Sequence, residues 1–146
     1  MAIQEYHRDP YLISTDPTRL NIPYIYEFLT TQTYWAQNRT LEVVRCSIEN
    51  SLNFGIYLGE VQVGYARVIT DYATFAWLCD VFVDPAHRKH GLGKWLVDCV
   101  VNHPDLSPLR RILLATRNAH ELYRKYGGFA PLANVDRWME KFNPNA

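Results

Sequence analysis

Apolar residues recur at helical spacing in the early part of the chain. The stretch TRLNIPYIYEFLTTQ places Asn21 where a helix N-cap is expected and Pro23 in the first turn, and apolar residues then follow at every third or fourth position. A second helical pattern, LEVVRCSIENS, follows Thr40. The pattern therefore predicts two helices joined by the loop TYWAQNR, which carries Tyr34 and Trp35.

The period changes in the middle of the chain from helical spacing to alternation. The stretch FGIYLGEVQVGYARVIT alternates around Gly59 and Glu60, which predicts a β-hairpin. The stretch TFAWLCDVFV is more continuously apolar and predicts a third, buried strand. We expect these three strands to be antiparallel neighbours.

Helical and extended patterns alternate in the remainder. Residues 91 to about 103 have helical spacing, RRILLATR predicts a short strand, NAHELYRKY a last helix, and GGFAPL a further edge strand. Helices that follow VFVDP and LLATR imply crossover connections. The sequence therefore predicts an α/β (α+β) fold with a mixed, mostly antiparallel sheet and helices on both faces, in a single domain over residues 1–146.

Composition and charge narrow the class of protein. The formal net charge is zero, so the chain has no broad electrostatic footprint for nucleic acid or an anionic membrane. No apolar stretch approaches the roughly 20 residues that span a bilayer, and the start has no signal-peptide pattern. We therefore expect a cytoplasmic protein with neither nucleic acid nor membrane as a partner.

The cysteines suggest packing rather than chemistry. Cys46, Cys79 and Cys99 have no metal-ligand spacing, and each lies in an apolar, periodic segment. A reduced thiol in such a segment behaves as a small hydrophobic group. We expect three core thiols and no metal site.

The hexapeptide RKHGLG stands between the buried strand and the following helix. The amides at a helix N-terminus have no intrahelical partner, and the helix dipole adds positive charge, so the junction can bind an anion. Gly91 and Gly93 would let the anion approach the backbone, and Arg88, Lys89 and Lys94 would attract it. An ordinary strand-to-helix turn with a solvated basic rim is the alternative, and the hexapeptide alone does not decide between them.

Two segments resemble the GNAT superfamily of N-acetyltransferases. VFVDPAHRKHGLGKWLV resembles its acetyl-CoA-binding segment, with Arg88, Gly91 and Gly93 at the signature positions. Many members have glycine where this chain has Lys89. TRNAHELYRKYGGF is similar to a second region of the family, in which the matching residues are Asn118, Leu122, Tyr123, Gly128 and Phe129.

The resemblance implies acetyl-CoA as co-substrate and a sheet that is splayed at the cofactor site. The loop would hold the pyrophosphate through backbone amides, and the end of the third strand would pair with the pantetheine arm as if with an extra strand. The expected cofactor-binding residues are Val81, Phe82, Val83, Arg88, Lys89, His90, Gly91, Leu92, Gly93, Lys94 and Asn118.

Acetyl transfer from a thioester needs a neutral amine, a polarised carbonyl and a proton for the leaving thiolate. A backbone N–H near Val81 could polarise the carbonyl, and Tyr123 occupies the family's usual general-acid position. Asp80 interrupts a buried strand, so it is either the general base or a carboxylate paired within the core. Asp71, Glu42 and a water relay are the alternatives for the base.

Aromatic residues are the candidates for the acceptor side. Trp35, Tyr72 and Trp77, with Tyr34, could line a site for a small amine, and the absence of an acidic excess argues against a polycationic acceptor. We expect direct transfer, in a ternary complex, to the primary amine of a small-molecule or amino-acid-like acceptor. A protein N-acetyltransferase and a non-catalytic acyl-CoA-binding sensor remain alternatives, and DRWMEKF hints at an edge strand of a homodimer.

Overall fold

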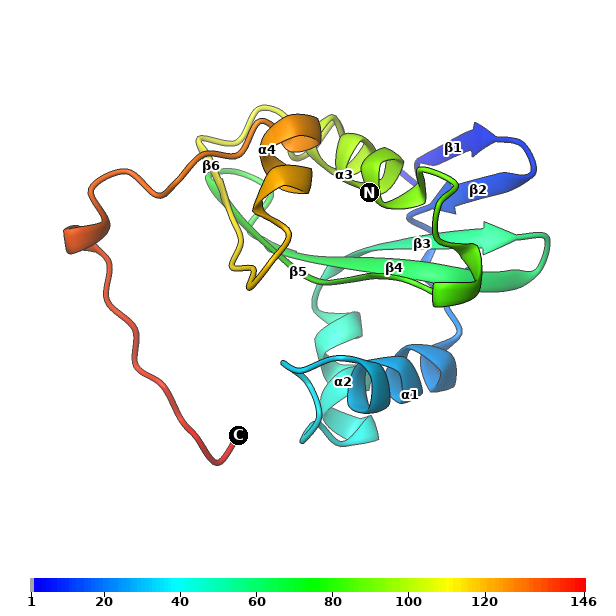
Figure 1. The fold of residues 1–146 in the computed structure, drawn as a ribbon, viewed down its shortest axis with the longest axis horizontal. Coiled ribbons are helices and arrows are strands. Elements are labelled where there is room, and N and C mark those ends of the chain that lie inside the picture. The colour runs from blue at the N-terminus through cyan, green and yellow to red at the C-terminus, as the bar shows by residue number, and fades with distance from the viewer. Residues whose placement is uncertain (1) are drawn as a thin grey trace.

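The computed structural model describes residues 2–146 and contains one six-stranded sheet in sequential order, β1 to β6 (Figure 1). Neighbours are antiparallel from β1 to β5, and β6 runs parallel to β5. The mixed, mostly antiparallel sheet predicted from the sequence is confirmed. Its strands are β1 (Glu5–Arg8), β2 (Tyr11–Ser14), β3 (Leu52–Leu58), β4 (Val61–Thr70), β5 (Phe75–Val83) and β6 (Arg111–Leu113).

Four α-helices cover the two faces of the sheet, α1 and α2 on one side and α3 and α4 on the other (Figure 1). The side chain of Asn21 caps α1, as the sequence predicts, and the side chain of Thr40, after which the second helix was expected, caps α2. None of the helices in residues 2–146 combines the length and apolar character that crossing a membrane requires. The helices are α1 (Ile22–Gln32), α2 (Leu41–Glu49), α3 (Leu92–Val101) and α4 (His120–Gly127).

The sheet separates two hydrophobic cores. On one face, Tyr65 and Phe82 pack with Ile25 and Leu29 of α1, and the rings of Phe28 and Phe82 stack with their centroids 3.9 Å apart. The larger core on the opposite face gathers apolar side chains from β3, β4, β5, α3 and α4. Because both faces are covered, β4 is buried along most of its length and forms a rigid base for the strand beside it.

The far edge of β5 is only partly covered, because β6 is short. β6 pairs with residues 75–77, and no strand within residues 2–146 pairs with that edge of β5 from Leu78 to Val83. On the β4 side, the register shifts so that Asp80 and Val81 together lie opposite Ala66. This β-bulge holds Asp80 at a positive φ of 52°. The predicted splay of the sheet is thus present beside β5.

Two predictions about the chain differ from the structure, and one element was not predicted. The unpredicted element is the N-terminal hairpin of β1 and β2, in which each strand has only four residues. GGFAPL is not a strand: Gly128, at φ 72°, ends α4 in the left-handed conformation, and the residues that follow pair with no strand of residues 2–146. DRWMEKF likewise forms no strand, and a short 3-10 helix, Val135–Arg137, precedes an exposed tail.

Candidate active site

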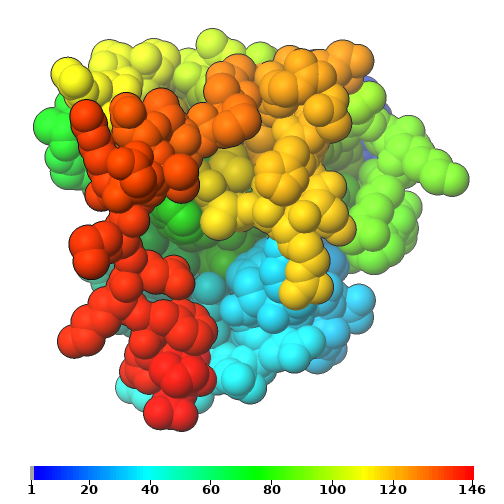
Figure 2. All heavy atoms as spheres, turned by 60° about the vertical axis from the view of Figure 1, so that its left-hand side comes forward, coloured from blue at the N-terminus to red at the C-terminus, as the bar shows by residue number. Residues whose placement is uncertain are grey.

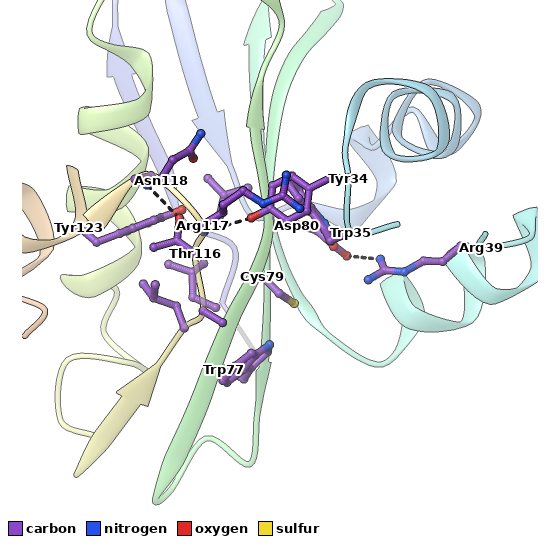
Figure 3. A pocket seen from close by; sticks show the side chains of 15 residues that line it. Tyr34, Trp35, Arg39, Trp77, Cys79, Asp80, Thr116, Arg117, Asn118 and Tyr123 are labelled. Atoms are coloured by element: carbon purple, nitrogen blue, oxygen red, sulfur yellow. Dashed lines mark hydrogen bonds and ion pairs between the residues drawn. The ribbon is translucent and has the colours of Figure 1, made fainter. Parts of the chain in front are cut away.

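A cavity of about 560 Å³ opens where β5 and β6 diverge. Figure 2 shows the molecule hollowed between α4 and the segment that follows α1. The α1–α2 loop supplies one rim, the chain between β6 and α4 supplies the other, and β5 lies between them (Figure 3). The cavity is lined by Tyr34, Trp35, Arg39, Trp77, Leu78, Cys79, Asp80, Val81, Leu114, Ala115, Thr116, Arg117, Asn118, Ala119 and Tyr123.

A second cavity of about 310 Å³ lies over the basic loop at the N-terminus of α3. Gly91 is the N-cap of α3 with φ 73°, and no heavy atom lies within 4 Å of the Cβ that a side chain would add at Gly91 or at Gly93. The space above the loop is therefore open, and free amides at the helix start border it. Its lining residues are Val83, Arg88, Lys89, Gly91, Leu92, Gly93, Lys94 and Leu122.

Lys89 occupies a position that favours glycine. Its φ is 70°, in the left-handed region where a Cβ is costly. This conformation gives a physical reason for the glycine that many GNAT proteins have at the position. The chain keeps a cation beside the cavity at the cost of backbone strain.

The free edge of β5 joins the two cavities. Val81 lines the larger cavity, and Val83 lines the smaller one. The Arg88 Nε donates a 3.1 Å hydrogen bond to the Val83 carbonyl, which ties the basic loop to the end of the strand. The side chain of Phe82 points into the α1 side of the core, so its backbone, which is the part predicted to pair with the cofactor, is what it can offer to a ligand.

Asp80 sits at the centre of a hydrogen-bonded cluster. Its side chain accepts hydrogen bonds from Trp35 Nε1, Arg39 Nη1 and Arg67 Nε, each 2.8 Å long. Burial alone would raise the pKa of Asp80, but the hydrogen bond from Arg39 and the charge of Arg67 outweigh it and lower the pKa. A carboxylate with a lowered pKa is a weak base. The geometry therefore favours the paired interpretation of Asp80 over the general base.

Tyr123 lies on the α4 wall of the larger cavity. The residue is 8% exposed, and its ring meets Phe129 edge-on at 5.9 Å. Burial, with a smaller contribution from the nearby Tyr34, raises the pKa of Tyr123 to about 12. The phenol thus stays protonated at neutral pH, as a proton donor must.

Two residues that the sequence did not connect join the rims of the cavity. The Arg117 guanidinium lies 3.7 Å from the centre of the Tyr34 ring. The Arg117 backbone N–H also donates a 3.1 Å hydrogen bond to the Tyr34 hydroxyl. No sequence spacing links positions 83 residues apart, so only the fold reveals this contact.

Of the remaining predicted site residues, some line the larger cavity and others lie outside it. Trp77 and Asn118 line the larger cavity, whereas Tyr72 lies in the β4–β5 turn and is not among the lining residues. His90 lies outside both linings, near the ring of Tyr11.

The alternative bases are also held elsewhere. Asp71 accepts hydrogen bonds from Ala73, Thr74 and Phe75 in the β4–β5 turn, and those from Thr74 contribute most to its lowered pKa. Glu42 is exposed in the first turn of α2. Neither residue lines the larger cavity.

The thiols do not form a reactive group. Burial raises the pKa of Cys79, on the cavity wall, to about 11, so it stays a thiol. Cys99 is buried as predicted. The expectation of a core position is wrong for Cys46, which is exposed because it lies on the outer side of α2.

Comparisons with known proteins identify the family. The sequence matches the acetyltransferase (GNAT) family over residues 22–129. A Gibberella zeae protein named as an acetyltransferase is 29% identical over an alignment that covers 91% of this chain and 86% of that protein. A crystal structure from Xanthomonas campestris pv. campestris, described as a GNAT-family acetyltransferase, has 45% identity, a TM-score of 0.89 and 97% coverage of both chains. A protein from Clostridium acetobutylicum, solved with acetyl-CoA, has the same fold at 14% identity, with a TM-score of 0.64 and coverage of 97% of this chain and 96% of its own. This chain belongs to the GNAT family of acetyltransferases.

Proposed function

We propose that this protein transfers the acetyl group of acetyl-CoA to the primary amine of a small-molecule or amino-acid-like acceptor, by direct attack in a ternary complex. One observation carries the proposal. The edge of β5 that no strand of residues 2–146 covers runs from the basic loop at the start of α3 to a cavity that contains a protonated tyrosine. Family membership supports acetyl transfer, and the two cavities support a ternary complex.

The residues present fit acetyl-CoA as co-substrate. The amides at the start of α3 can hold a pyrophosphate in the open space over Gly91 and Gly93, with Arg88, Lys89 and Lys94 adding charge. The backbone of β5 from Val81 to Val83 can hydrogen-bond an extended arm, because no strand satisfies its outer edge. When bound, acetyl-CoA supplies a thioester whose acetyl carbon accepts the amine.

The bulge in β5 provides a donor for the reaction. Asp80 and Val81 share one partner residue on β4, so one of the two peptide units is left out of the regular ladder. We assign the Val81 amide the role of polarising the thioester carbonyl, since Val81 lines the cavity. Tyr123 then donates its proton to the leaving thiolate.

The amine must lose a proton before it attacks. An alkyl amine with a pKa near 10.4 pays about 4 to 5 kcal/mol for this at neutral pH. Asp80 is held by two arginines, and it is the only acid among the cavity-lining residues that the structure describes. We therefore propose that water carries the proton away and that the cationic cavity favours the neutral amine.

The size and closure of the cavity favour a small acceptor over a protein. A volume of about 560 Å³ is in the range of sites for small molecules. The contact between Tyr34 and Arg117 connects the two rims, which limits access for a polypeptide. The non-catalytic sensor has no comparable support, because the wall carries the protonated Tyr123 that turnover requires.

A homodimer remains part of the proposal. Residues 130–146 are exposed throughout and extend away from the sheet (Figure 1). Val135, Met139 and Phe142 in this arm are 67%, 95% and 75% exposed. Three large apolar groups on one exposed segment are typical of a protein interface. A second copy of the chain is the partner that we propose.

The test of the function is release of free CoA thiol from acetyl-CoA with a panel of small amines, amino acids and short peptides. We expect acceptor-dependent release with small acceptors, and a much lower rate in Tyr123→Phe at unchanged affinity for acetyl-CoA measured by calorimetry. Release only with peptides would favour the protein acetyltransferase. No release from protein that binds acetyl-CoA would contradict the proposed reaction.

A further inference from the structure

The larger cavity carries an excess of positive charge. Arg39 and Arg117 line it, and Arg67 is bonded to the same carboxylate as Arg39. Asp80 is the single acid on the described part of the wall. Arg39 and Arg67 are thus paired with one carboxylate, and Arg117 adds a further positive charge to the wall of a protein whose formal net charge is zero.

Arg117 is the member of this group that is available to a ligand. Within residues 2–146, no carboxylate forms an ion pair with it, whereas Arg39 and Arg67 are both committed to Asp80. Its stem and backbone are held against Tyr34 by the ring contact and by the hydrogen bond to the hydroxyl. These contacts with Tyr34 hold the Arg117 guanidinium in place, and the N–H donors along its edge remain available to a ligand.

The adjoining wall is aromatic and apolar. Trp77 and Val81 from β5, with Tyr34 and Trp35 from the opposite rim, line the same cavity as Arg39 and Arg117. Tyr34 and Trp35 are 45% and 41% exposed, so this wall is apolar but partly open to solvent. An apolar wall beside a guanidinium strengthens its interaction with an anion relative to bulk water. A planar guanidinium with two parallel N–H donors matches the two oxygens of a carboxylate.

We propose that the acceptor carries a carboxylate as well as its primary amine, and that Arg117 binds this carboxylate, with Arg39 nearby. The inference rests on the proposed acetyl transfer, for which it names the acceptor class: small amino acids. The cationic cavity then has two effects on one ligand, because it attracts the carboxylate and disfavours the charged form of the amine. Arg117 is a specificity residue in this scheme and takes no part in proton transfer.

The test compares pairs of acceptors that differ only in the carboxylate. Amino acids from glycine to 5-aminovalerate, and phenylalanine, are each paired with the corresponding carboxamide, and kcat/KM is divided by the fraction of neutral amine. A hydrogen-bonded ion pair is worth about 1.5–3 kcal/mol, so we expect the favoured acid to exceed its amide by about 10- to 100-fold. Equal corrected values for every pair would overturn the inference.

Two variants assign the preference to Arg117. Arg117→Met keeps a long stem against Tyr34 and removes the charge, so the preference for the acid should fall to about threefold or less. Arg45→Met is the matched control, because Arg45 is exposed on α2 and does not line the cavity. The preference should persist in Arg45→Met. A preference unchanged in Arg117→Met would contradict the assigned role.

A binding measurement separates this inference from the proposed reaction. Calorimetry in the presence of CoA compares N-acetyl amino acids with their carboxamides, in wild type and in Arg117→Met. Tighter binding of the acids that is lost in Arg117→Met supports the carboxylate site even if no acceptor turns over, in which case only the proposed reaction fails. Equal binding of acids and amides overturns the carboxylate site, whatever the turnover.

Discussion

The indole of Trp35 donates a 2.8 Å hydrogen bond to the carboxylate of Asp80. Trp35 belongs to the loop between α1 and α2, whereas Asp80 lies at the bulge of β5. Asp80 is 3% exposed and is also held by two arginines. Because loops are usually more mobile than strands, this bond fixes the loop to the more rigid sheet. One buried carboxylate thereby sets the position of the α1–α2 loop relative to the bulge of β5.

Asp80→Asn should destabilise the fold while leaving the shape of the pH profile of kcat/KM unchanged. The substitution tolerates the positive φ but leaves Arg67 buried without its counter-ion, at a cost of about 3–5 kcal/mol. Thermal unfolding followed by circular dichroism measures the loss. Trp35→Phe, which removes one hydrogen bond to the charge, should cost about 1.5–3 kcal/mol. Loss of the acidic limb of the pH profile in Asp80→Asn would instead identify Asp80 as the general base, because protonation of the base causes that limb.

Tyr123→Phe should lower kcat by about 10²-fold or more, with little change in affinity for acetyl-CoA. The raised pKa means that the acidic form of Tyr123 persists up to about pH 12, so its ionisation should cause no fall in kcat between pH 7 and 10. Steady-state rates and calorimetry on the same preparations separate the two effects. A rate equal to that of wild type would remove Tyr123 from the reaction.

Two substitutions in the basic loop should affect different quantities, one mainly cofactor affinity and the other mainly stability. Gly91→Val fills the open space over the loop at a positive φ and should weaken acetyl-CoA binding by at least about tenfold. Lys89→Gly relieves a strained backbone and should raise stability by roughly 1 kcal/mol, with a modest loss of affinity because a cation is removed. Calorimetry and urea denaturation report the two quantities. Unchanged affinity in Gly91→Val would argue against a pyrophosphate at this loop.

His103 should make the fold less stable at mildly acidic pH. The residue is buried beside Phe54, and burial lowers its pKa from 6.5, although Asp105 opposes the shift. As the pH falls through about 6.5, His103 binds a proton in the unfolded chain but remains neutral in the folded protein, so the free energy of unfolding decreases. Urea denaturation at pH 7.5 and 5.5 measures this decrease.

A variant that cannot titrate isolates the histidine. His103→Asn retains an acceptor for the Asp105 amide and should lose less stability between the two pH values than wild type. His7→Asn, at an exposed position, should behave as wild type. Identical pH dependence in wild type and His103→Asn would show that other groups govern acid sensitivity.

The C-terminal arm should determine the oligomeric state. Met139→Ser combined with Phe142→Ser removes the two most exposed large apolar groups of the arm, and we expect it to shift a dimer toward monomer. Light scattering after size exclusion measures the mass. Val61→Ser, which alters an exposed apolar residue outside the arm, is the control. A monomeric wild type at high protein concentration would rule out the proposed dimer.

The sequence predictions were accurate where the interactions join residues that are close in sequence, and less accurate where they join distant ones. Periodicity and caps located the four helices and the central hairpin, since Asn21, Thr40 and Gly59 act on adjacent residues. Asp80 was recognised as unusual because a charge interrupts an apolar strand, but Arg39 and Arg67 lie 41 and 13 residues away and left no local signal. The GGFAPL prediction failed for a related reason. A strand needs a partner, and composition alone does not supply one.

Contacts between residues distant in sequence also limited the prediction of the aromatic residues on the acceptor side. Tyr34 and Trp35 were singled out as aromatic residues on one loop, and the fold brings them to the cavity. Tyr72 is also aromatic but belongs to the turn between β4 and β5, outside the lining of the cavity. Arg117 was not singled out, because its importance comes from Tyr34 across the cavity.

The length of the uncovered edge of β5 also determines how long a ligand must be to reach from one end of it to the other. The loop at Gly91 and the cavity at Tyr123 are fixed to the two ends of a backbone that advances about 3.3 Å per residue. In the proposed reaction, a carrier anchored by its phosphates brings its acetyl group into the cavity beside Tyr123 only if the linker between phosphates and acetyl group spans this interval. Acetyl phosphate, which has no linker, could occupy the loop and still fall short of the amine. In the proposed reaction the strand thus sets the length of the donor, while Arg117 selects the acceptor.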